Sequence, residues 1–302
     1  MKIRLLIGLY GLLILGETVF PGLWPDALTY LPPVAFWLPP VFLILFALKS
    51  RERQYLAWGC AVAAQVILTS PFGVSLATFE SSNSKSFTMV TWNMKHGWQG
   101  AEDVVEYLGQ SPPDIILLQE AQENLAIRLL TEKIPDYHLV RSLETDNDVA
   151  VFTRFPIQKQ EPLPDFPGFN LLATVQIGQE NVNLVNLHLD KASKSKIPVR
   201  SIWSTTTLHA EAREELLNHL GKTKGPIIVA GDFNAPSAAP VLRRLPLQEV
   251  RGLGLEATFP DAFPLWRLDH ILINNQLRVN SCWVDPVSFS DHRPVWARLS
   301  FR

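Results

Sequence analysis

Eight polar side chains lie at the ends of short apolar runs in the part of the chain after residue 86. Each run is typical of a buried strand, and a core strand gains nothing from a carboxylate, an imidazole or an amide at its end. The residues are Asn93, Glu120, His188, Asp232, Asn234, Asp269, Asp291 and His292. In α/β sheets, ligands bind at the carboxyl ends of the strands. Asp291 and His292 precede their strand, so they reach the same edge if that strand runs antiparallel. We therefore expect one shared cleft.

The chemical types of these side chains indicate hydrolysis of a phosphate ester. The four carboxylates are hard oxygen ligands that suit Mg²⁺ or Mn²⁺. The two imidazoles can move protons near neutral pH, and the two amides can hold anionic oxygens. A divalent cation among such groups is a common arrangement for phosphoester cleavage. The sequence contains neither a glycine-rich phosphate loop of the P-loop type nor a GxSxG nucleophile elbow.

Each of these residues also has an ordinary explanation when it is taken alone. A lone Asn or Glu at a strand end usually caps a turn or a helix. A histidine within a strand, such as His188, is more often a hydrogen-bonded core residue, and Asp269 with His270 could pair with Arg267 on the surface. The joint occurrence of all these residues in this order favours a catalytic site.

The elements that must position the site are predicted from residue 87 onward. Strands are expected over 87–94, 114–120, 148–155, 171–177, 181–189, 226–234, 268–273, 280–285 and 293–301, where β-branched and aromatic residues dominate. Helices are expected over 101–110, 123–134, 209–220 and 239–245. In the third helix Ala212, Leu216, Leu217 and Leu220 form an apolar stripe, and Gly221 ends it. Some strands follow one another without a helix, which favours an α/β sandwich with mixed sheets.

Residues 1–80 are predicted to form a transmembrane region with about three helices, joined by a polar linker at 81–86 to a catalytic domain at 87–302. The apolar stretches are 5–20, 34–48 and 55–74, and a span needs about 20 apolar residues. The second stretch is short and contains Pro39 and Pro40. A cleaved signal peptide for the first stretch, a re-entrant second stretch and a buried helical hairpin are the alternatives.

Basic residues predict the orientation of these segments. Lys2 and Arg4 precede the first stretch, and Lys49, Arg51 and Arg53 lie between the second and the third. By the positive-inside rule these segments are cytoplasmic. Three crossings then place the catalytic domain on the non-cytoplasmic side of an integral membrane protein.

The charge of the chain gives a weak indication of substrate. Residues 86–302 contain 21 Lys and Arg and 25 Asp and Glu, so their balance is 21 − 25 = −4. Nucleases that bind duplexes usually gain affinity from a basic surface. Cys60 and Cys282 are the only cysteines and indicate no compartment. No protein partner is evident.

The runs TWNMKHG, ILLQE, NLHL, GDFNAP, RLDHIL and SDHRPV together resemble the endonuclease/exonuclease/phosphatase superfamily, with its DNase I-like fold. The resemblance covers residues 87–302. It implies a four-layer sandwich of two mixed β-sheets flanked by helices, and a phosphoesterase that depends on a divalent cation, Mg²⁺ or Mn²⁺.

The resemblance also implies a role for each residue of the set. Glu120 is expected to be the main metal ligand, beside Asn93 and Asp291. His292 acts as general base or steadies the phosphate, and Asp269 orients it. Asp232 positions the attacking water, and Asn234 and His188 contact the phosphate oxygens. Glu144, Asp148 and Arg154 are candidates for a further contact, and the loop 190–205 for substrate specificity.

Three functions follow from these observations. The first is a membrane-anchored phosphodiesterase or phosphatase that hydrolyses a lipid or a small phosphoester. The second is a membrane-tethered Mg²⁺-dependent endonuclease or exonuclease. The third, a catalytically silent scaffold, is the weakest because no residue of the matched runs is replaced.

Overall fold

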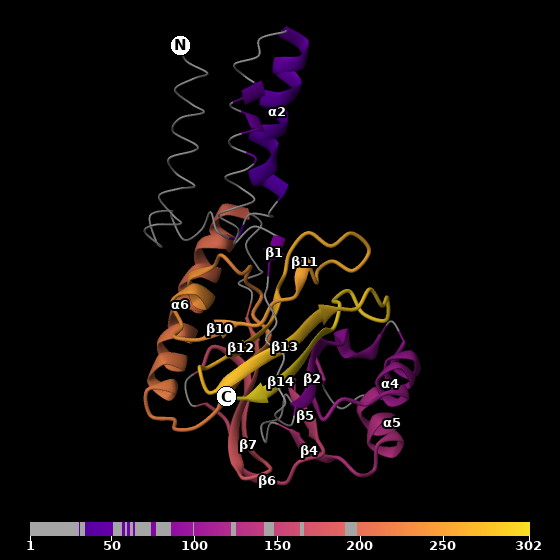
Figure 1. The fold of residues 1–302 in the computed structure, drawn as a ribbon. Coiled ribbons are helices and arrows are strands. Elements are labelled where there is room, and N and C mark those ends of the chain that lie inside the picture. The colour runs from indigo at the N-terminus through magenta and orange to yellow at the C-terminus, as the bar shows by residue number, and fades with distance from the viewer. Residues whose placement is uncertain are drawn as a thin grey trace.

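The computed structural model describes residues 86–302 except 99, 122–124, 142–147, 164–165 and 191–197. It also describes Tyr30, 34–50, 74–76 and five positions of the segment 56–63, namely 56, 57, 59, 60 and 63. Two six-stranded sheets form the centre of this structure (Figure 1).

The first sheet has the strand order β13-β14-β2-β3-β5-β4. Its strands are β2 (Ser86–Asn93), β3 (Ile115–Gln119), β4 (His138–Arg141), β5 (Ala150–Thr153), β13 (Leu277–Val284) and β14 (Val295–Phe301). β2 and β3 are parallel, whereas the other neighbours are antiparallel, so the sheet is mixed.

The second sheet has the strand order β10-β12-β9-β8-β7-β6. Its strands are β6 (Ile157–Glu161), β7 (Gly168–Ile177), β8 (Glu180–Leu189), β9 (Ile227–Asp232), β10 (Gln248–Glu249) and β12 (Asp269–Ile273). β8 and β9 are parallel, and the remaining pairs are antiparallel. Both sheets therefore contain one parallel pair whose strands end at the same edge.

Three apolar cores hold the layers together. One core lies between the sheets and takes side chains such as Met89, Leu117, Leu184 and Ile271 from both. A second joins the outer face of the β8–β9 sheet to α6 (Pro198–Leu220) and α7 (Pro240–Arg243). A third joins the outer face of the β2–β3 sheet to α4 (Ala101–Gln110) and α5 (Leu125–Lys133). Helices thus flank both sheets, as the sequence predicts.

The structure contains every expected strand and helix of residues 87–302. It adds the short strands β4, β6, β10 and β11 (Leu253–Leu255). β2 begins at Ser86, the last residue of the expected linker, and α6 extends eleven residues before His209. The apolar stripe of α6 lies against the sheet: Ala212 and Leu216 are fully buried, and Leu217 and Leu220 pack beside them.

The second apolar stretch forms the helix α2 (Val34–Ser50), which stands apart from the sheets in Figure 1. Among the described residues no helix meets the length and apolarity needed to cross a membrane. The stretch 5–20, most of 55–74 and the linker residues 81–85 lie outside the described residues. At the end of the third stretch, β1 (Val74–Leu76) pairs with β11 (Leu253–Leu255) in a small antiparallel ribbon.

Candidate active site

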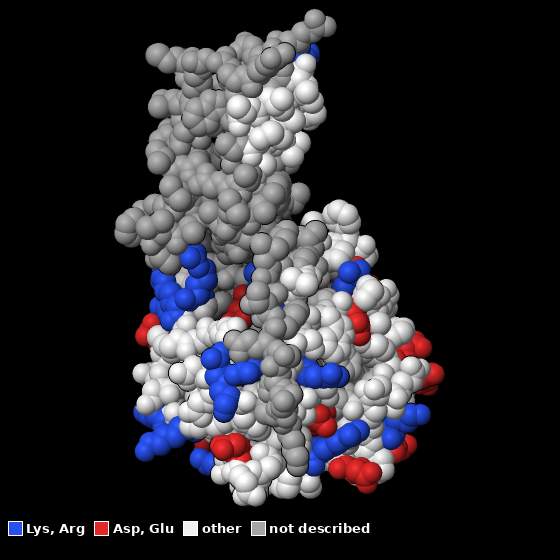
Figure 2. Space-filling view, viewed as in Figure 1, with Lys and Arg blue, Asp and Glu red and all other residues white. Residues whose placement is uncertain are grey.

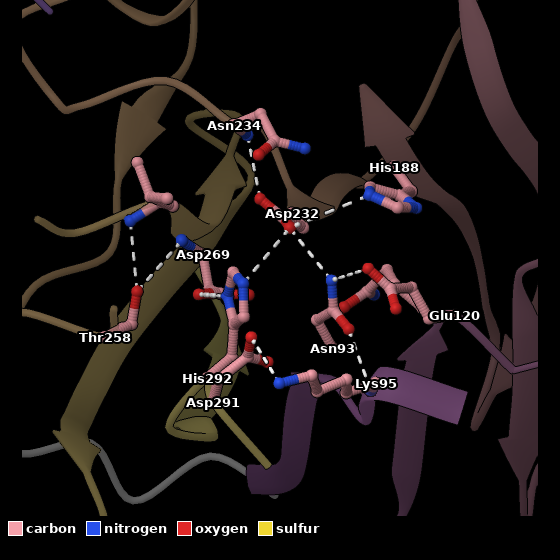
Figure 3. A network of polar contacts seen from close by, with 12 residues as sticks. Asn93, Lys95, Glu120, His188, Asp232, Asn234, Thr258, Asp269, Asp291 and His292 are labelled. Carbon is pink, nitrogen blue, oxygen red and sulfur yellow. Dashed lines mark hydrogen bonds and ion pairs between the residues drawn. The ribbon is translucent and has the colours of Figure 1, made fainter. Parts of the chain in front are cut away.

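All eight predicted residues lie on one edge of the two sheets. Asn93 ends β2 and Glu120 directly follows β3, while Asp232 ends the parallel strand β9. In the ladders of the second sheet, Asp232 lies opposite Asp269 on one side and opposite His188 on the other. Asp291 and His292 precede β14, which runs antiparallel to β2 and so starts at the same edge. Figure 3 shows the eight side chains gathered around Asp232.

Asn93 connects the two sheets at this edge. Its amide nitrogen donates hydrogen bonds to Glu120 Oε1 at 3.1 Å and to Asp232 Oδ2 at 3.0 Å. Its amide oxygen accepts from the backbone N–H of Lys95 at 3.0 Å. Asn93 therefore bridges two carboxylates as a donor, and its amide oxygen, which accepts one hydrogen bond, keeps a second lone pair.

Two histidines approach Asp232 from opposite sides, and each is backed by a buried carboxylate. His188 Nδ1 lies 2.5 Å from Asp148 Oδ2, and His292 Nδ1 lies 2.8 Å from Asp269 Oδ2. The Nε2 atoms lie 3.8 Å (His188) and 3.7 Å (His292) from Asp232 Oδ2. A carboxylate on Nδ1 fixes the orientation of an imidazole and directs Nε2 at the reaction centre.

The close charges shift the pKa values of this group. Burial lowers the pKa of His188, but its hydrogen bond to Asp148 and the negative charge of Asp232 outweigh burial and raise it above the ordinary value. Burial also lowers the pKa of His292, but the negative charges of Asp269 and Asp232 outweigh burial and raise this pKa to about 9. Burial raises the pKa of Asp232, but the two imidazoles more than compensate and hold it below its usual range. The Asp232 carboxylate therefore favours the charged form of both imidazoles, and they in turn favour its own charged form.

Four non-glycine residues at this edge have positive φ angles: 46° at Lys95, 55° at His96, 50° at Glu120 and 46° at Asn234. Such conformations cost energy and concentrate at functional sites. The backbone N–H of His96 donates to the carbonyl of Glu120 at 3.1 Å, which joins two of the strained turns. Asn234 is held by two bonds: its N–H donates to Asp232 Oδ1 at 2.8 Å and its side-chain amide to the Leu189 carbonyl at 2.7 Å.

Lys95 and His96 are site residues that the sequence analysis missed, although both lie within the run TWNMKHG. Lys95 Nζ lies 3.0 Å from Asp291 Oδ2, and His96 Nε2 lies 3.2 Å from Glu120 Oε2. Each carboxylate predicted to bind metal is therefore paired with a basic side chain from this turn. The positive φ angles that direct these side chains to the carboxylates are not visible in the sequence.

The structure places two of the three candidates for a further contact, one inside the site and one away from it. Asp148 is buried and bonded to His188, whereas Glu144 lies outside the described residues, as does the part 191–197 of the proposed specificity loop. Arg154 donates to the Tyr137 hydroxyl at 2.7 Å and lies 3.9 Å from Asp114. Asp114 precedes β3, so Arg154 belongs to the opposite edge of the sheet.

The segment between β11 and β12 supports the site from one side. The Thr258 hydroxyl accepts hydrogen bonds from the N–H groups of Leu268 at 3.0 Å and Asp269 at 3.3 Å. The Phe259 ring lies 4.7 Å from the His292 ring, and the Asp261 N–H donates to the Asp291 carbonyl at 2.8 Å. The segment therefore holds both members of the Asp269–His292 pair in place.

Among the described residues, the structure brings together one group of atoms that could bind a metal ion. Asp232, Asp269 and His292 each contribute an atom to a group whose members lie within 4.8 Å of one another. This group is internally hydrogen bonded, although Asp269 Oδ1 is buried without a hydrogen-bond partner among the described residues. Glu120 and Asp291 are more open, with about a fifth and a third of their side chains exposed. Hard carboxylate oxygens on one edge fit Mg²⁺ or Mn²⁺.

Comparison with known proteins points to one family. The model of the Endonuclease/Exonuclease/phosphatase family matches residues 90–292, from β2 to His292. No curated protein matches the sequence.

Solved structures share the fold at low identity. D. rerio TDP2 complexed with a single-strand DNA product is 14% identical, with a TM-score of 0.60 over 72% of this chain and 99% of that chain. An endonuclease/exonuclease/phosphatase from Bacteroides vulgatus is 17% identical, with a TM-score of 0.60 over 72% and 100%. A mannosyl-6-phosphatase from Bacteroides thetaiotaomicron is 18% identical, with a TM-score of 0.57 over 71% and 100%.

Proposed function

Because the chain belongs to the Endonuclease/Exonuclease/phosphatase family, we propose that it is a membrane-anchored phosphoesterase that depends on Mg²⁺ and also accepts Mn²⁺. The observation that carries the proposal is the buried Asp232 carboxylate between two imidazoles, each backed by its own acid. A scaffold would gain no stability from so many buried charges, because burying ionised groups is costly.

The side chains divide the work of hydrolysis between them. Asp232 positions a water molecule for attack. Its Oδ2 lies at the centre of the group, and the neighbouring imidazoles of His188 and His292 stabilise its negative charge. The Nε2–H groups of His188 and His292 donate to phosphate oxygens, and Asn234 adds to these contacts. Asp148 and Asp269 are positioning residues that keep the two rings in place.

Glu120 and Asp291 would hold the cation, with Asn93 beside them. When bound there, a divalent ion neutralises phosphate charge and stabilises the transition state. Lys95 and His96 now lie on these carboxylates, so they must move aside or share them.

Replacing Lys95 by Met is expected to tighten Mn²⁺ binding by about two- to five-fold, since it removes an ammonium that competes for Asp291. Isothermal titration calorimetry on the full chain in detergent checks this. Lys159→Met is the matched control, because Lys159 pairs with Glu161 on an exposed strand. Equal or weaker binding by Lys95→Met would show that Asp291 is no part of the metal site.

The contact of Tyr30 supports a domain that lies on the same side of the membrane as the loop between the first and second stretches. The Tyr30 hydroxyl lies 2.6 Å from His209 Nδ1, and its carbonyl accepts from Trp266 Nε1 at 3.3 Å. Tyr30 and the domain must therefore share one side of the membrane. The chain between Tyr30 and the domain then crosses the membrane an even number of times. The second and third stretches lie in this part of the chain, so either both of them cross or neither does. A re-entrant second stretch combined with a crossing third would make this contact impossible.

The exposed surface of α2 supports the proposed membrane anchoring. Phe42, Leu45 and Leu48 are 67%, 60% and 63% exposed, and the helix carries no acidic residue. These three side chains are uncharged and apolar, so lipid could cover them without burying a charge.

A topology reporter gives a direct expectation. Alkaline phosphatase fused after Arg302 is expected to be active and green fluorescent protein at the same position dark, because the first folds only after export and the second only before it. The control is a pair of fusions after Arg51, in the predicted cytoplasmic loop, which should give the reverse pattern. A fluorescent fusion after Arg302 would place the domain in the cytoplasm.

The substrate is proposed to be a lipid or a small phosphoester rather than a nucleic acid. Figure 2 shows Lys and Arg interspersed with Asp and Glu over this face of the domain, and residues 86–302 have a balance of −4. A duplex would gain little from such a surface. The alternative, a tethered nuclease, is favoured by the likeness to a protein solved with a DNA product.

A substrate panel tests the proposal. The full chain with Mg²⁺ is given phospholipid vesicles, a soluble phosphodiester, soluble phosphomonoesters, oligonucleotides and plasmid DNA. Turnover of a lipid or a small ester at a rate well above that of DNA is expected. A strong preference for DNA would support the nuclease instead.

A further inference from the structure

Two large apolar side chains are exposed on β11 and on the segment that joins β11 to β12. Leu253 is 66% exposed and Phe263 is 70% exposed, whereas most large apolar residues of the domain are buried. We call residues 253–266 the rim segment. Single exposed apolar side chains are common on protein surfaces, so what distinguishes these two is where the rim segment lies in the fold.

The rim segment is attached to the ends of the predicted membrane stretches. β1 begins at Val74, the last residue of the third stretch, and it pairs with the rim segment in the register Val74 to Leu255 and Leu76 to Leu253. Trp266, at the other end of the rim segment, donates to the carbonyl of Tyr30, which lies four residues before α2. In Figure 1, β1 and β11 lie between α2 and the two sheets. A bilayer crossed by these stretches would therefore begin beside the rim segment.

The same segment forms a wall of the active site. Phe259 lies against His292, Asp261 is bonded to the backbone of Asp291, and Thr258 holds the N–H of Asp269. Another exposed aromatic residue lies close to the metal-ligand side of the site: Trp98 is 77% exposed, and its ring lies 4.8 Å from that of His96, which contacts Glu120. The site is thus bordered by apolar side chains.

The charges of the rim segment do not oppose burial in lipid. Its only ionisable acids are Glu256 and Asp261. Glu256 lies 3.0 Å from the buried Arg267, and Asp261 lies 2.7 Å from Arg293. A paired carboxylate costs less to bring near hydrocarbon than a free one, and Trp and Phe suit the membrane interface.

We infer that the rim segment dips into the bilayer surface, and that the substrate is a phosphoester in the head group of a membrane lipid. The inference rests on the proposed function and narrows its substrate. The bilayer, rather than a second copy of the chain, is the occupant because the chain's own apolar stretches end beside this segment. A head group at the membrane surface then lies within reach of the site.

The test compares a lipid with a soluble substrate on the full chain in nanodiscs of phosphatidylethanolamine and phosphatidylglycerol. The double variant Leu253→Ser, Phe263→Ser is expected to lose at least about ten-fold in phospholipid hydrolysis relative to hydrolysis of bis-p-nitrophenyl phosphate. Leu125→Ser is the matched control, because Leu125 is exposed on α5, in the outer helical layer. The ratio of phospholipid hydrolysis to soluble-ester hydrolysis in Leu125→Ser should equal that of the parent.

Cross-linking gives a readout that does not depend on turnover. A photoreactive p-benzoylphenylalanine in place of Phe263 is expected to form a lipid adduct in the nanodisc, and the same group in place of Leu125 is not. Cleavage of the soluble ester without lipid cleavage, an unchanged ratio, or a protein adduct at position 263 would overturn the inference. Failure to cleave either ester would instead overturn the proposed phosphoesterase, while the lipid adduct would still report the docking of the rim segment.

Discussion

Replacing Asp232 by Asn is expected to lower kcat about 1,000-fold with little change in fold. Asp232 is the centre of the site: it accepts from Asn93 and Asn234 and faces both imidazoles. Asn keeps the size and one acceptor but loses the charge that positions water and attracts its proton, and a positioned base contributes about 10²- to 10⁴-fold. Turnover of a soluble phosphodiester at saturating Mg²⁺ measures the loss.

The matched control for this variant is Asp136→Asn, because Asp136 is exposed in the turn between α5 and β4. Its kcat should equal that of the parent. Thermal unfolding of both variants shows whether the fold is intact. If Asp232→Asn keeps more than a tenth of the parent's kcat, Asp232 is not the residue that positions the water.

Replacing Glu120 by Gln is expected to weaken Mn²⁺ binding about 100-fold or more and to nearly abolish turnover at limiting Mg²⁺. Removing a group that merely supports a metal ligand already costs about 10- to 100-fold, and Glu120 is proposed to be a ligand itself. Gln can still accept the hydrogen bond from Asn93, so the turn at this position should persist. Calorimetric titration with Mn²⁺ measures the affinity.

Glu161→Gln controls for the loss of one carboxylate on the chain, since Glu161 lies on the exposed strand β6 and pairs with Lys159. Its Mn²⁺ affinity should match that of the parent. High Mg²⁺ is expected to restore part of the turnover of Glu120→Gln, because a weakened ligand set still fills at high concentration. Parent-like affinity in Glu120→Gln would rule out Glu120 as a ligand.

The sequence predicted the sheets and the edge of the site because both depend on local patterns. Strands such as β2, β3, β8 and β9 are apolar runs with a polar residue at or just after the end, and this pattern is visible without coordinates. The edge strands β4, β6 and β10 were missed because they are short or exposed and carry few apolar residues.

Contacts between distant residues could not be predicted in the same way. The role of Asp148 depends on its meeting His188 from the other sheet. Lys95 and His96 reach the carboxylates through left-handed backbone conformations, which lysine and histidine adopt too rarely for the sequence to indicate them. The contact of Tyr30 with His209 joins residues 179 positions apart. Each is a property of the assembled fold.

Hydrolysis of a soluble phosphodiester in ¹⁸O-labelled water tests the central claim most directly, with the full chain and Mg²⁺. The account predicts that mass spectrometry finds one ¹⁸O atom on the phosphate product of each turnover, and that removal of the metal by EDTA or the change Asp232→Asn stops its appearance. Label found in the alcohol product, or equal turnover with and without metal, would contradict the assignment of this site to metal-dependent attack of water on phosphorus.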